Sequence, residues 1–520
     1  CLSSLPVLVI DDLTHPEAVV RSSAAQALAS LLEEWPDSLP DTLQVILDKF
    51  VQHKKLIPAV LDDFGRQVAP PLDPWEPRSG LASALTAMAP QMRPESVLHV
   101  MEFLVRQGFA DRNTQVQTQM LDAGMAMLET HGKAMVGDLL PLFQALLDGT
   151  PSSADADFIR QSLVLLMGSL AKYLSEGDPR VQPIVAKLIE ALSTPSQQVQ
   201  EAVANCLPPL VSTSAVKQSS AQLVHDLMHC LLESENYGDR RGAAYGLAGF
   251  VKGLGILSLK KMDIISQLTE AISNKANPRH REGALFGIEL LSTMLGRLFE
   301  PYVVVLLPHL LVCFGDSNQY VRQAADECAK AVMGKLSVHG VKLIMPLLLE
   351  ALNDDSWRTK AGSVELLGSM AYCAPKQLSS CLPAIVPKLI EVLSDSHPKV
   401  QRSGSQALKL IGSVIRNPEI QAIVSILIQA LEDPAHKTSS CLATLLETKF
   451  VHFIDAPSLA LIMPIVQRAF QDRSTETRKM AAQIIGNMYS LTDQKDLTPY
   501  LPNILPGLKG SLLDPLPEVR

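Results

Sequence analysis

The side chains best suited to catalysis or metal binding are few and scattered in this sequence. His225, His229 and Cys230 are spaced so that one helix face would offer metal ligands at i, i+4 and i+5. No second ligand cluster accompanies them, so we interpret them as ordinary polar positions of a helix. The acidic doublets Asp62-Asp63 and Asp354-Asp355 are interpreted as turn and capping residues rather than as a paired acid and base.

Motifs of nucleotide-binding and hydrolytic enzymes are missing as well. Gly132-Lys133 and Gly334-Lys335 are followed by Ala and Leu, so neither completes a phosphate-binding loop. The sequence contains no G-x-S-x-G elbow and no H-E-x-x-H pair. We therefore expect no catalytic residues, no cofactor, no metal and no small-molecule substrate.

Basic side chains offer the remaining chemistry, which is electrostatic. They recur at similar phases of a repeat, near the start of its second helix: Arg240, Arg241, Arg279, His280, Arg281, Arg322, Arg358, Lys399, Arg402, Lys437, Arg478 and Lys479. Along one edge of a stack they would form a broken ladder able to follow phosphates. The alternative is that each arginine pairs with an aspartate of the adjacent turn. Aromatic residues are too sparse to predict sequence-specific reading of single strands.

A short phrase positions these residues: an aliphatic or polar residue, then Arg or Gln, then small residues that open a helix. It gives ten anchors, at 159–161, 199–201, 240–242, 280–282, 321–323, 357–359, 400–402, 438–439, 477–479 and 519–520. The 360 residues from 160 to 520 span nine intervals of 40. This period lies at the lower edge of the HEAT range and is too long for 34-residue helical hairpins.

Two further signals run in phase with the anchors. First helices carry an internal proline, as at Pro308, Pro346, Pro387, Pro464 and Pro506, and we expect each to bend its helix. Second helices follow Asp-rich turns, at 315–318, 353–356, 394–398 and 471–474, whose short polar side chains can accept hydrogen bonds from free N–H groups. Apolar residues then follow one helical face, as at Ala325, Cys328, Ala329 and Val332.

These signals predict an all-α HEAT/armadillo-type solenoid, a right-handed superhelix of antiparallel helix pairs with negligible strand. Residues 151–520 form the regular array. Residues 1–150 are predicted to be irregular HEAT repeats, with a second helix over 15–35 and an exposed proline-rich loop over 69–77. That loop is a candidate docking segment.

Composition supports a long helical array. Hydrophobic residues make up 47% of the 520 and aromatic residues 5%, a mixture suited to helices packed on helices. The net charge of −9 is uneven, since residues 1–230 hold 15 Lys and Arg against 26 Asp and Glu, whereas 231–520 hold 30 against 28. An anionic partner is therefore expected at the second part.

Location and completeness are also indicated by the sequence. No apolar run reaches the roughly 18 to 20 residues of a spanning helix, and residues 1–10 lack a basic leader, so we expect no membrane partner. The eight cysteines, Cys1 included, show no framework spacing and indicate reduced thiols in a cytoplasmic protein. The missing initiator Met and the end at 517–520, which resembles the opening of another helix, indicate a piece of a longer chain.

Several phrases carry a more specific resemblance. Thr448–Arg468 (TKFVHFIDAPSLALIMPIVQR) and Arg478–Met488 (RKMAAQIIGNM) closely resemble the general control non-derepressible translational activators, the family of stalled-ribosome sensors. Arg281–Gly287 (REGALFG) and Trp357–Leu366 (WRTKAGSVEL) are similar to the same family. The likeness covers most of the chain, is strongest from about 235 onward, and extends more loosely to the HEAT region of fungal elongation factor 3.

The resemblance implies a ribosome-bound, non-catalytic scaffold in the cytoplasm. Such a scaffold senses stalled or collided ribosomes and promotes activation of the kinase that phosphorylates initiation factor 2 alpha during amino-acid starvation. The ATPase cassette of elongation factor 3 is missing here, and the family's kinase-docking segment would lie outside this chain. The expected partners are the ribosome, through its proteins or rRNA phosphates, and that kinase through regions outside the chain.

On this basis the candidate ribosome-binding residues are Arg240, Arg241, Arg279, Arg281, Arg478 and Lys479, expected to be exposed charges at repeat edges. Two other kinds of HEAT scaffold remain open. A nuclear import receptor is expected to be acidic throughout, and an armadillo cargo groove would repeat tryptophans, whereas Trp35, Trp75 and Trp357 are not periodic. A tubulin-binding array would end near six repeats.

Overall fold

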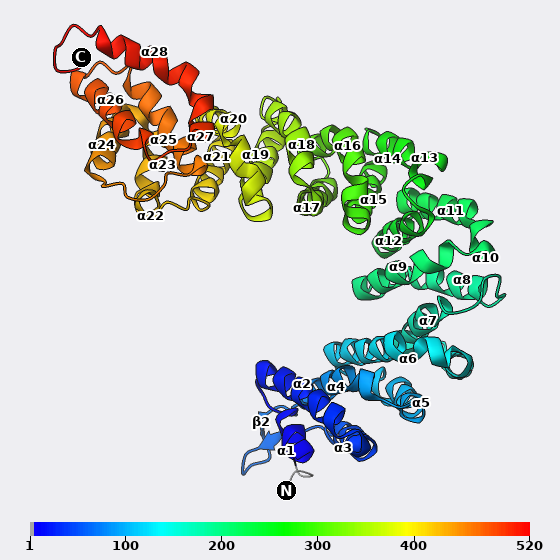
Figure 1. Ribbon diagram of the computed structural model, residues 1–520. Helices are drawn as coiled ribbons and strands as arrows, with labels where there is room; N and C mark the ends of the chain where they lie inside the picture. Colours follow the sequence, from blue (N-terminus) through cyan, green and yellow to red (C-terminus); the bar gives the residue numbers. More distant parts are fainter. Residues whose placement is uncertain (1–4) are drawn as a thin grey trace. The chain divides into compact units, whose positions relative to one another are not determined.

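The computed structural model describes residues 5–520, and their side chains from Leu8 onward; Cys1 lies outside the described residues. Its contacts divide the chain into two compact units, which are described separately. Unit 1 comprises residues 1–230 and 234–255, and unit 2 comprises residues 231–233 and 256–520. Within each unit, antiparallel helix pairs stack in chain order (Figure 1). The predicted all-α solenoid class is confirmed.

Unit 1 is built from six repeats, each with a first and a second helix. Its elements are α1 (Leu5–Asp12), α2 (Ala18–Glu34), α3 (Leu39–Gln52), β1 (Val60–Leu61), β2 (Gln67–Ala69), α4 (Trp75–Met88), α5 (Pro94–Phe103), the π-helical turn Leu104–Gly108, α6 (Thr114–Asp148), α7 (Asp157–Ala171), α8 (Val181–Ala191), α9 (Gln197–Val211), α10 (Ser214–Lys217), α11 (Ser220–Glu233) and α12 (Tyr237–Leu254). The 35-residue α6 serves two repeats, because its first part packs on α4 and α5 and it also packs on α7.

Unit 2 continues the same pattern with a more regular spacing. Its elements are α13 (Ser258–Lys261), α14 (Ile264–Ile272), α15 (Pro278–Leu295), α16 (Glu300–Cys313), α17 (Gln319–Lys335), α18 (Val338–Ala351), α19 (Trp357–Cys373), α20 (Pro375–Leu393), α21 (Pro398–Gly412), α22 (Pro418–Gln421), α23 (Val424–Glu432), α24 (Pro434–Glu447), α25 (Ala456–Ala469), α26 (Thr475–Tyr489), α27 (Gln494–Leu497) and α28 (Leu501–Leu512). Second helices α15, α17, α19 and α21 pack on one another in order.

The helix boundaries follow from local chemistry. Second helices α15, α17, α19 and α26 begin directly after Asn277, Asn318, Ser356 and Ser474, whose side chains accept hydrogen bonds from backbone N–H groups of the first turn. The predicted starts after Asp-rich turns are thus confirmed. The predicted prolines Pro308, Pro346, Pro387, Pro464 and Pro506 do lie inside first helices.

Small residues let a second helix approach the end of the first helix of the previous repeat closely. Gly80, Gly242 and Gly283 are each the sixth residue of a second helix. A Cβ at Gly283 would lie 2.3 Å from the Leu231 carbonyl oxygen, and one at Gly80 would lie 1.8 Å from the carbonyl oxygen of Leu13. The small residues of the repeated phrase are therefore required by backbone packing.

The region around 53–74 differs from the predicted loop. Residues 54–73 form an extended β-hairpin between α3 and α4, with Val60 opposite Ala69 and a further bridge between Ile57 and Leu72. Helix α4 starts at Trp75, so the last three residues of the predicted loop 69–77 are helical. Pro77 fits there because the first turn of a helix leaves its N–H groups unpaired.

One stretch of the described chain, Pro278–Cys313, is long and apolar enough to cross a membrane by length and composition. It comprises two helices of successive repeats, α15 and α16, joined by the 3₁₀ turn Gly296–Phe299. Many of its apolar residues, such as Leu291 and Leu307, are buried against neighbouring helices, whereas Leu298, Val305 and Val312 are exposed.

Candidate interaction surfaces

Each second helix has Arg, Lys or Gln as its fourth residue. These residues are Arg21, Arg78, Gln117, Arg160, Gln200, Arg240, Arg281, Arg322, Lys360, Gln401, Lys437 and Arg478. Many of them reach back to carbonyl groups of the preceding turn, which the helix itself cannot pair. The Nη1 atom of Arg281 donates to the carbonyl oxygens of Asn274 and Lys275, at 2.7 and 3.1 Å. Arg478 bonds the carbonyl oxygens of Asp472 and Arg473 in the same way.

The same side chains also reach forward to an aspartate of the next repeat. Arg281 makes a two-pronged ion pair with Asp316, with Nε–Oδ2 and Nη2–Oδ1 distances of 2.7 and 3.0 Å. Lys360 pairs with Asp395 at 2.9 Å and Arg478 with Asp514 at 3.0 Å. We call this set of pairs the inter-repeat ladder. Each aspartate also accepts a backbone N–H two residues later, so one carboxylate orders the turn and joins two repeats.

The six predicted binding residues are placed unequally with respect to this ladder. Arg281 and Arg478 belong to it. Arg240 and Arg241 are 7% and 8% exposed, and the Arg241 guanidinium lies 5.8 Å from the ring centroid of Tyr245. The expectation of exposed charges is therefore wrong for Arg240, Arg241 and Arg281, because each lies in the packed start of a second helix.

The other two predicted residues are more accessible. Arg279 and Lys479 are partly exposed. The Arg279 guanidinium donates to the carbonyl oxygen of Glu233, at 3.3 Å, while its neighbour His280 contacts the Glu233 carboxylate at 2.7 Å. Within residues 5–520 neither Arg279 nor Lys479 forms an ion pair with a carboxylate. Their charges remain available to a partner.

The exposed cations at the starts of second helices in unit 2 are Arg358, Lys399, Arg402 and Lys437. Arg358 and Lys399 are the second residues of α19 and α21, which are packed neighbours. The ring of Trp357 stacks on His397, with centroids 4.2 Å apart and planes 5° apart. The Arg358 guanidinium and the Lys399 ammonium lie 4.7 and 5.1 Å from the Trp357 ring centroid. This stack holds two positive charges close together at the surface.

The sequence analysis did not predict this cluster, because it considered Trp357 without its neighbours in the next repeat. Trp357 and His397 are 40 residues apart, one repeat, and they meet only when α19 and α21 pack. The repeat period itself was the available signal, since equal phases in adjacent repeats become neighbours.

The side chains considered from the sequence as metal ligands or as an acid–base pair are either exposed or already hydrogen-bonded to backbone groups. His225 and His229 are exposed on α11, and Cys230 contacts the carbonyl oxygen of Asp239 at 3.6 Å. Among residues 5–520 there is no group of three His, Cys, Asp or Glu side chains arranged to hold a metal ion. Asp62 and Asp354 accept backbone N–H groups of their own turns, which confirms their interpretation as turn residues.

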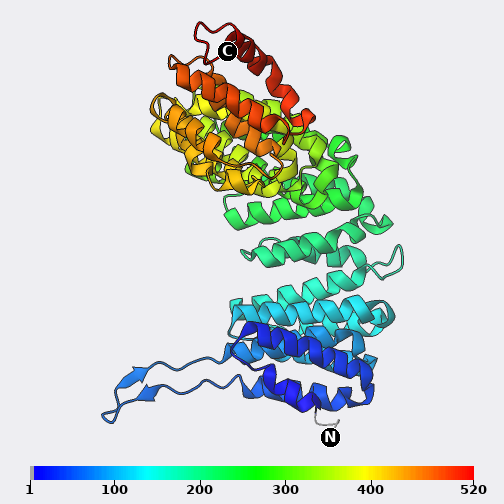
Figure 2. The same cartoon turned by 60° about the vertical axis from the view of Figure 1, so that its left-hand side comes forward.

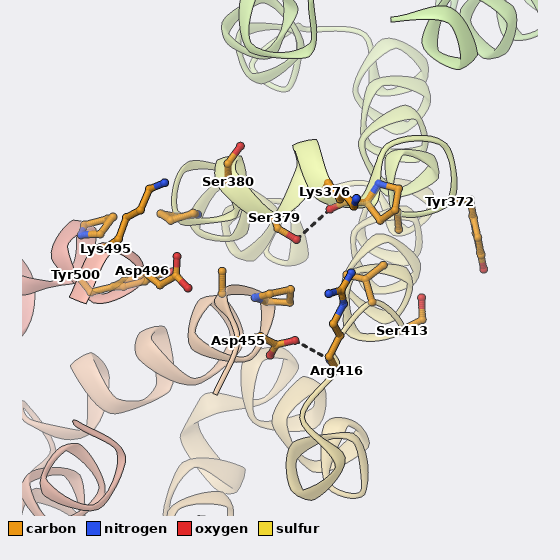
Figure 3. Close-up of a pocket in the computed structure, with 17 residues that line it drawn as sticks. Tyr372, Lys376, Ser379, Ser380, Ser413, Arg416, Asp455, Lys495, Asp496 and Tyr500 are labelled. Atoms are coloured by element: carbon orange, nitrogen blue, oxygen red, sulfur yellow. Dashed lines mark hydrogen bonds between the residues drawn. The ribbon is translucent and has the colours of Figure 1, made fainter. Parts of the chain in front are cut away.

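A groove of about 770 Å³ lies within unit 2, between α19, α20, the start of α25 and α27 (Figure 3). Arg416, Lys376 and Lys495 line it together with Asp455 and Asp496. The backbone N–H of Arg416 donates to Asp455 at 2.6 Å. Burial raises the pKa of Asp496, and the nearby Asp493 adds to this shift. Because both signs of charge surround the groove, it has no marked preference for an anion.

Comparison with known proteins shows which family the chain belongs to. The profile described as "Stalled ribosome sensor GCN1, HEAT repeats" matches residues 3–172. The human stalled ribosome sensor GCN1 is 62% identical over 514 residues, which cover 99% of this chain and 19% of the human protein. The chain belongs to the GCN1 family. It spans about a fifth of the length of these relatives.

Further matches include another GCN1 protein and the HEAT repeats of elongation factor 3. The eIF-2-alpha kinase activator GCN1 of Saccharomyces cerevisiae is 40% identical over 96% of this chain and 19% of its own length. The profile "EF3 N-terminal HEAT repeat" matches residues 240–408, and "Elongation factor 3/GNC1 HEAT repeat" matches 437–520. Elongation factor 3 of Gonapodya prolifera is 32% identical over 55% of this chain and 26% of its own. The chain thus contains an elongation factor 3-like region, as the sequence resemblance implied.

Solved structures add only distant likenesses. Kap95p, in its complex with RanGDP, covers 99% of this chain and 64% of its own with a TM-score of 0.44 at 15% identity. Kap121p covers 98% of this chain and 51% of its own with a TM-score of 0.43 at 17% identity. We infer no function for the chain from them.

Proposed function

We propose that this chain is a non-catalytic, ribosome-contacting scaffold segment of a cytoplasmic translational regulator. Its parent would sense stalled or collided ribosomes and promote activation of the kinase that phosphorylates initiation factor 2 alpha. The observation that carries the proposal is 62% identity along 99% of the chain to a protein named a stalled ribosome sensor. Relatives named eIF-2-alpha kinase activators support the second part.

The arrangement of charge supports a contact with anionic partners through unit 2. Unit 2 and residues 234–255 contain most of the basic residues, and three of their acidic residues, Asp316, Asp395 and Asp514, are held in the inter-repeat ladder. The cations that remain accessible at the starts of second helices include Arg279, Arg358, Lys399, Arg402, Lys437 and Lys479. Point charges spaced by one repeat suit a phosphate backbone, since binding then releases counterions from several sites at once.

This assignment refines the predicted binding set. Arg279 and Lys479 are kept as contact residues. Arg240, Arg241, Arg281 and Arg478 are proposed to act on ribosome binding mainly through the repeats they hold together. Their reversal to Glu is then expected to unfold repeats, which would mask any direct effect on binding.

Co-sedimentation with purified ribosomes across a salt series tests the proposal. The 520-residue chain should pellet with ribosomes, and the triple change Arg358→Gln, Lys399→Gln and Arg402→Gln should weaken binding. The slope of log affinity against log salt should fall by about 2, because three phosphate contacts are lost. Unchanged thermal unfolding of the triple variant would show that its repeats remain intact.

A matched control removes the same number of exposed charges from unit 1. Arg93, Arg106 and Lys133 are exposed there, and their change to Gln should leave the slope unchanged. If the control lowers the slope as much as the test variant, the contact follows net charge and not the edge of unit 2. A chain that does not pellet with ribosomes at any salt concentration would contradict the proposed function itself.

The kinase is proposed to bind outside residues 1–520. The chain alone should then not retain the purified kinase. Other regions of the longer protein would hold the kinase on the ribosome. Direct retention of the kinase by this chain on beads would contradict this part of the proposal.

A further inference from the structure

Residues 54–73 form the most exposed apolar feature of unit 1, which we call the hairpin arm. It projects away from the helices of its own repeat (Figure 2, blue). Its large apolar side chains are about half to nine-tenths exposed: Leu56 50%, Ile57 49%, Val60 56%, Leu61 59%, Phe64 86%, Val68 68% and Leu72 62%. Such a concentration on a segment of this length is unusual for a surface that water alone contacts.

The root of the arm is fixed by two arginines, each of which bonds both legs. Arg78 is fully buried, and it donates to the carbonyl oxygen of His53 on one leg and to the Asp73 carboxylate on the other. Arg112 donates to the carbonyl oxygen of Lys54 at 2.6 Å and to Asp73 at 2.8 Å. The arm is therefore held at its base by helix α4 of its own repeat and by the turn that precedes α6 of the next repeat.

The tip is also ordered by specific bonds. The Asp62 carboxylate accepts the backbone N–H groups of Phe64 and Arg66, at 2.9 and 2.7 Å. Gly65 has a φ of +75°, which this turn requires and which a side chain would disfavour. The geometry thus presents Phe64 at the end of an anchored ribbon and leaves its ring exposed.

The charge of the arm restricts what can cover it. Lys54, Lys55 and Arg66 are balanced by Asp62, Asp63 and Asp73, and the tip carries Asp62 and Asp63 against Arg66, a net charge of −1. Phosphates of RNA and anionic lipid headgroups would meet these carboxylates first, so both are disfavoured. An apolar surface with room for a projecting aromatic ring is the complementary partner, and protein surfaces provide such clefts.

We propose that the hairpin arm docks into an apolar cleft of a protein component of the ribosome, with Phe64 as its central anchor. The choice of a ribosomal partner rests on the proposed function. This contact is separate in kind from the basic edge of unit 2, because it depends on nonpolar burial and not on charge. Its strength should therefore vary little with salt.

The test compares arm variants with wild type in the same ribosome co-sedimentation. Phe64→Ser combined with Val68→Ser should lower affinity about tenfold or more, by the same factor at low and high salt, since central aromatic anchors often dominate an interface. Val19→Ser serves as the matched control, because Val19 is 76% exposed on α2 of the same unit. It should not change affinity, and neither variant should change the thermal unfolding temperature.

Photo-crosslinking identifies what covers the arm. A benzoyl-phenylalanine placed at position 64 should crosslink to ribosomal protein when the chain is bound to purified ribosomes. Crosslinks to rRNA only, to a second copy of this chain only, or to nothing would overturn the proposal, and so would equal binding of the double variant. In those cases wild-type ribosome binding would still support the proposed function. If wild type does not bind ribosomes, the proposed function fails and the arm proposal falls with it.

Discussion

Arg78 in unit 1 and Arg281 in unit 2 occupy the same place in their repeats, as fourth residue of a second helix, yet they hold different things. Arg281 reaches back to its own turn and forward to Asp316, so it only joins repeats. Arg78 makes the corresponding forward pair with Asp111, and in addition fixes both legs of the hairpin arm through His53 and Asp73. The fourth position of a second helix therefore joins repeats in unit 2, whereas in unit 1 it also fixes the hairpin arm in place.

The difference shows how a repeat array gains a binding surface. The fourth position of a second helix is constrained where its side chain has partners in two repeats at once, as at Arg78, Arg281 and Arg478. Positions nearby are not constrained in this way. In unit 2 the second position carries exposed cations at Arg358 and Lys399, and in unit 1 the connection between α3 and α4 has expanded into the arm. Interaction surfaces therefore arise at positions and loops whose side chains take no part in the inter-repeat ladder.

The largest expected effect is the loss of the Arg78 network. Arg78→Met leaves the Asp111 carboxylate buried without its partner, which should cost about 3–5 kcal/mol in the free energy of unfolding. Urea unfolding followed by circular dichroism measures it. Arg106→Met is the control, since its ion pair with Glu102 is exposed and should contribute less than about 1 kcal/mol. Equal effects of the two changes would show that the arm root is not held by buried charge.

A smaller effect separates the fourth position from the second within unit 2. Arg281→Gln breaks a two-pronged, mostly buried pair and should destabilise by about 2 kcal/mol, because bonds to a charged acceptor are lost. Arg358→Gln removes an exposed charge and its cation–π contact with Trp357, and should destabilise by about 0.5–1 kcal/mol. The midpoint of urea unfolding distinguishes them. Comparable shifts would remove the distinction between ladder and surface cations.

Backbone packing at the sixth position gives a third test. Gly283→Ala places a methyl group 2.3 Å from the carbonyl oxygen of Leu231, and we expect a loss of about 1–3 kcal/mol. Gly486→Ala has nothing within 4 Å and lies inside α26, so it should stabilise by about 0.5–1 kcal/mol. The two glycines should thus shift the thermal midpoint in opposite directions, and a shift of the same sign would contradict the close-approach account.

Much of the fold follows from sequence because its signals are local. Asn318 and Ser356 stand directly before the helices they cap, and Pro308 and Pro464 mark first helices, so period and helix starts could be predicted. The ladder pairs could not be assigned, because Arg281 and Asp316 are 35 residues apart and meet only after two repeats stack. Arg281 was for that reason taken as an exposed charge.

The hairpin arm escaped the sequence analysis for a different reason. Prolines Pro70, Pro71 and Pro74 hide the weak alternation of its strands, and Trp75–Pro77 reads as loop although it forms the first turn of α4. Its anchoring depends on Asp111 and Arg112, more than 35 residues away. Neighbouring residues alone carry no signal for such a clamp.

The smallest expected effect is on the pH dependence of the arm root. Hydrogen bonds from Arg78 lower the pKa of Asp73 to about 2, from an ordinary value near 3.8. A carboxyl whose folded pKa is depressed stabilises fully above its unfolded pKa and loses that contribution as pH falls toward the folded value. The stabilisation by Asp73 should therefore be constant above about pH 5 and decline between about pH 4 and pH 2. Asp73→Asn lacks this carboxylate, so wild type should protect the arm amides Ile57 and Leu72 from hydrogen exchange better than the variant at pH 6. The difference should shrink as the pH falls through 3 and nearly vanish at about pH 2 and below. A constant difference across this range would mean that the legs are held by the carbonyl contacts of Arg78 and Arg112, and that the Asp73 charge contributes little.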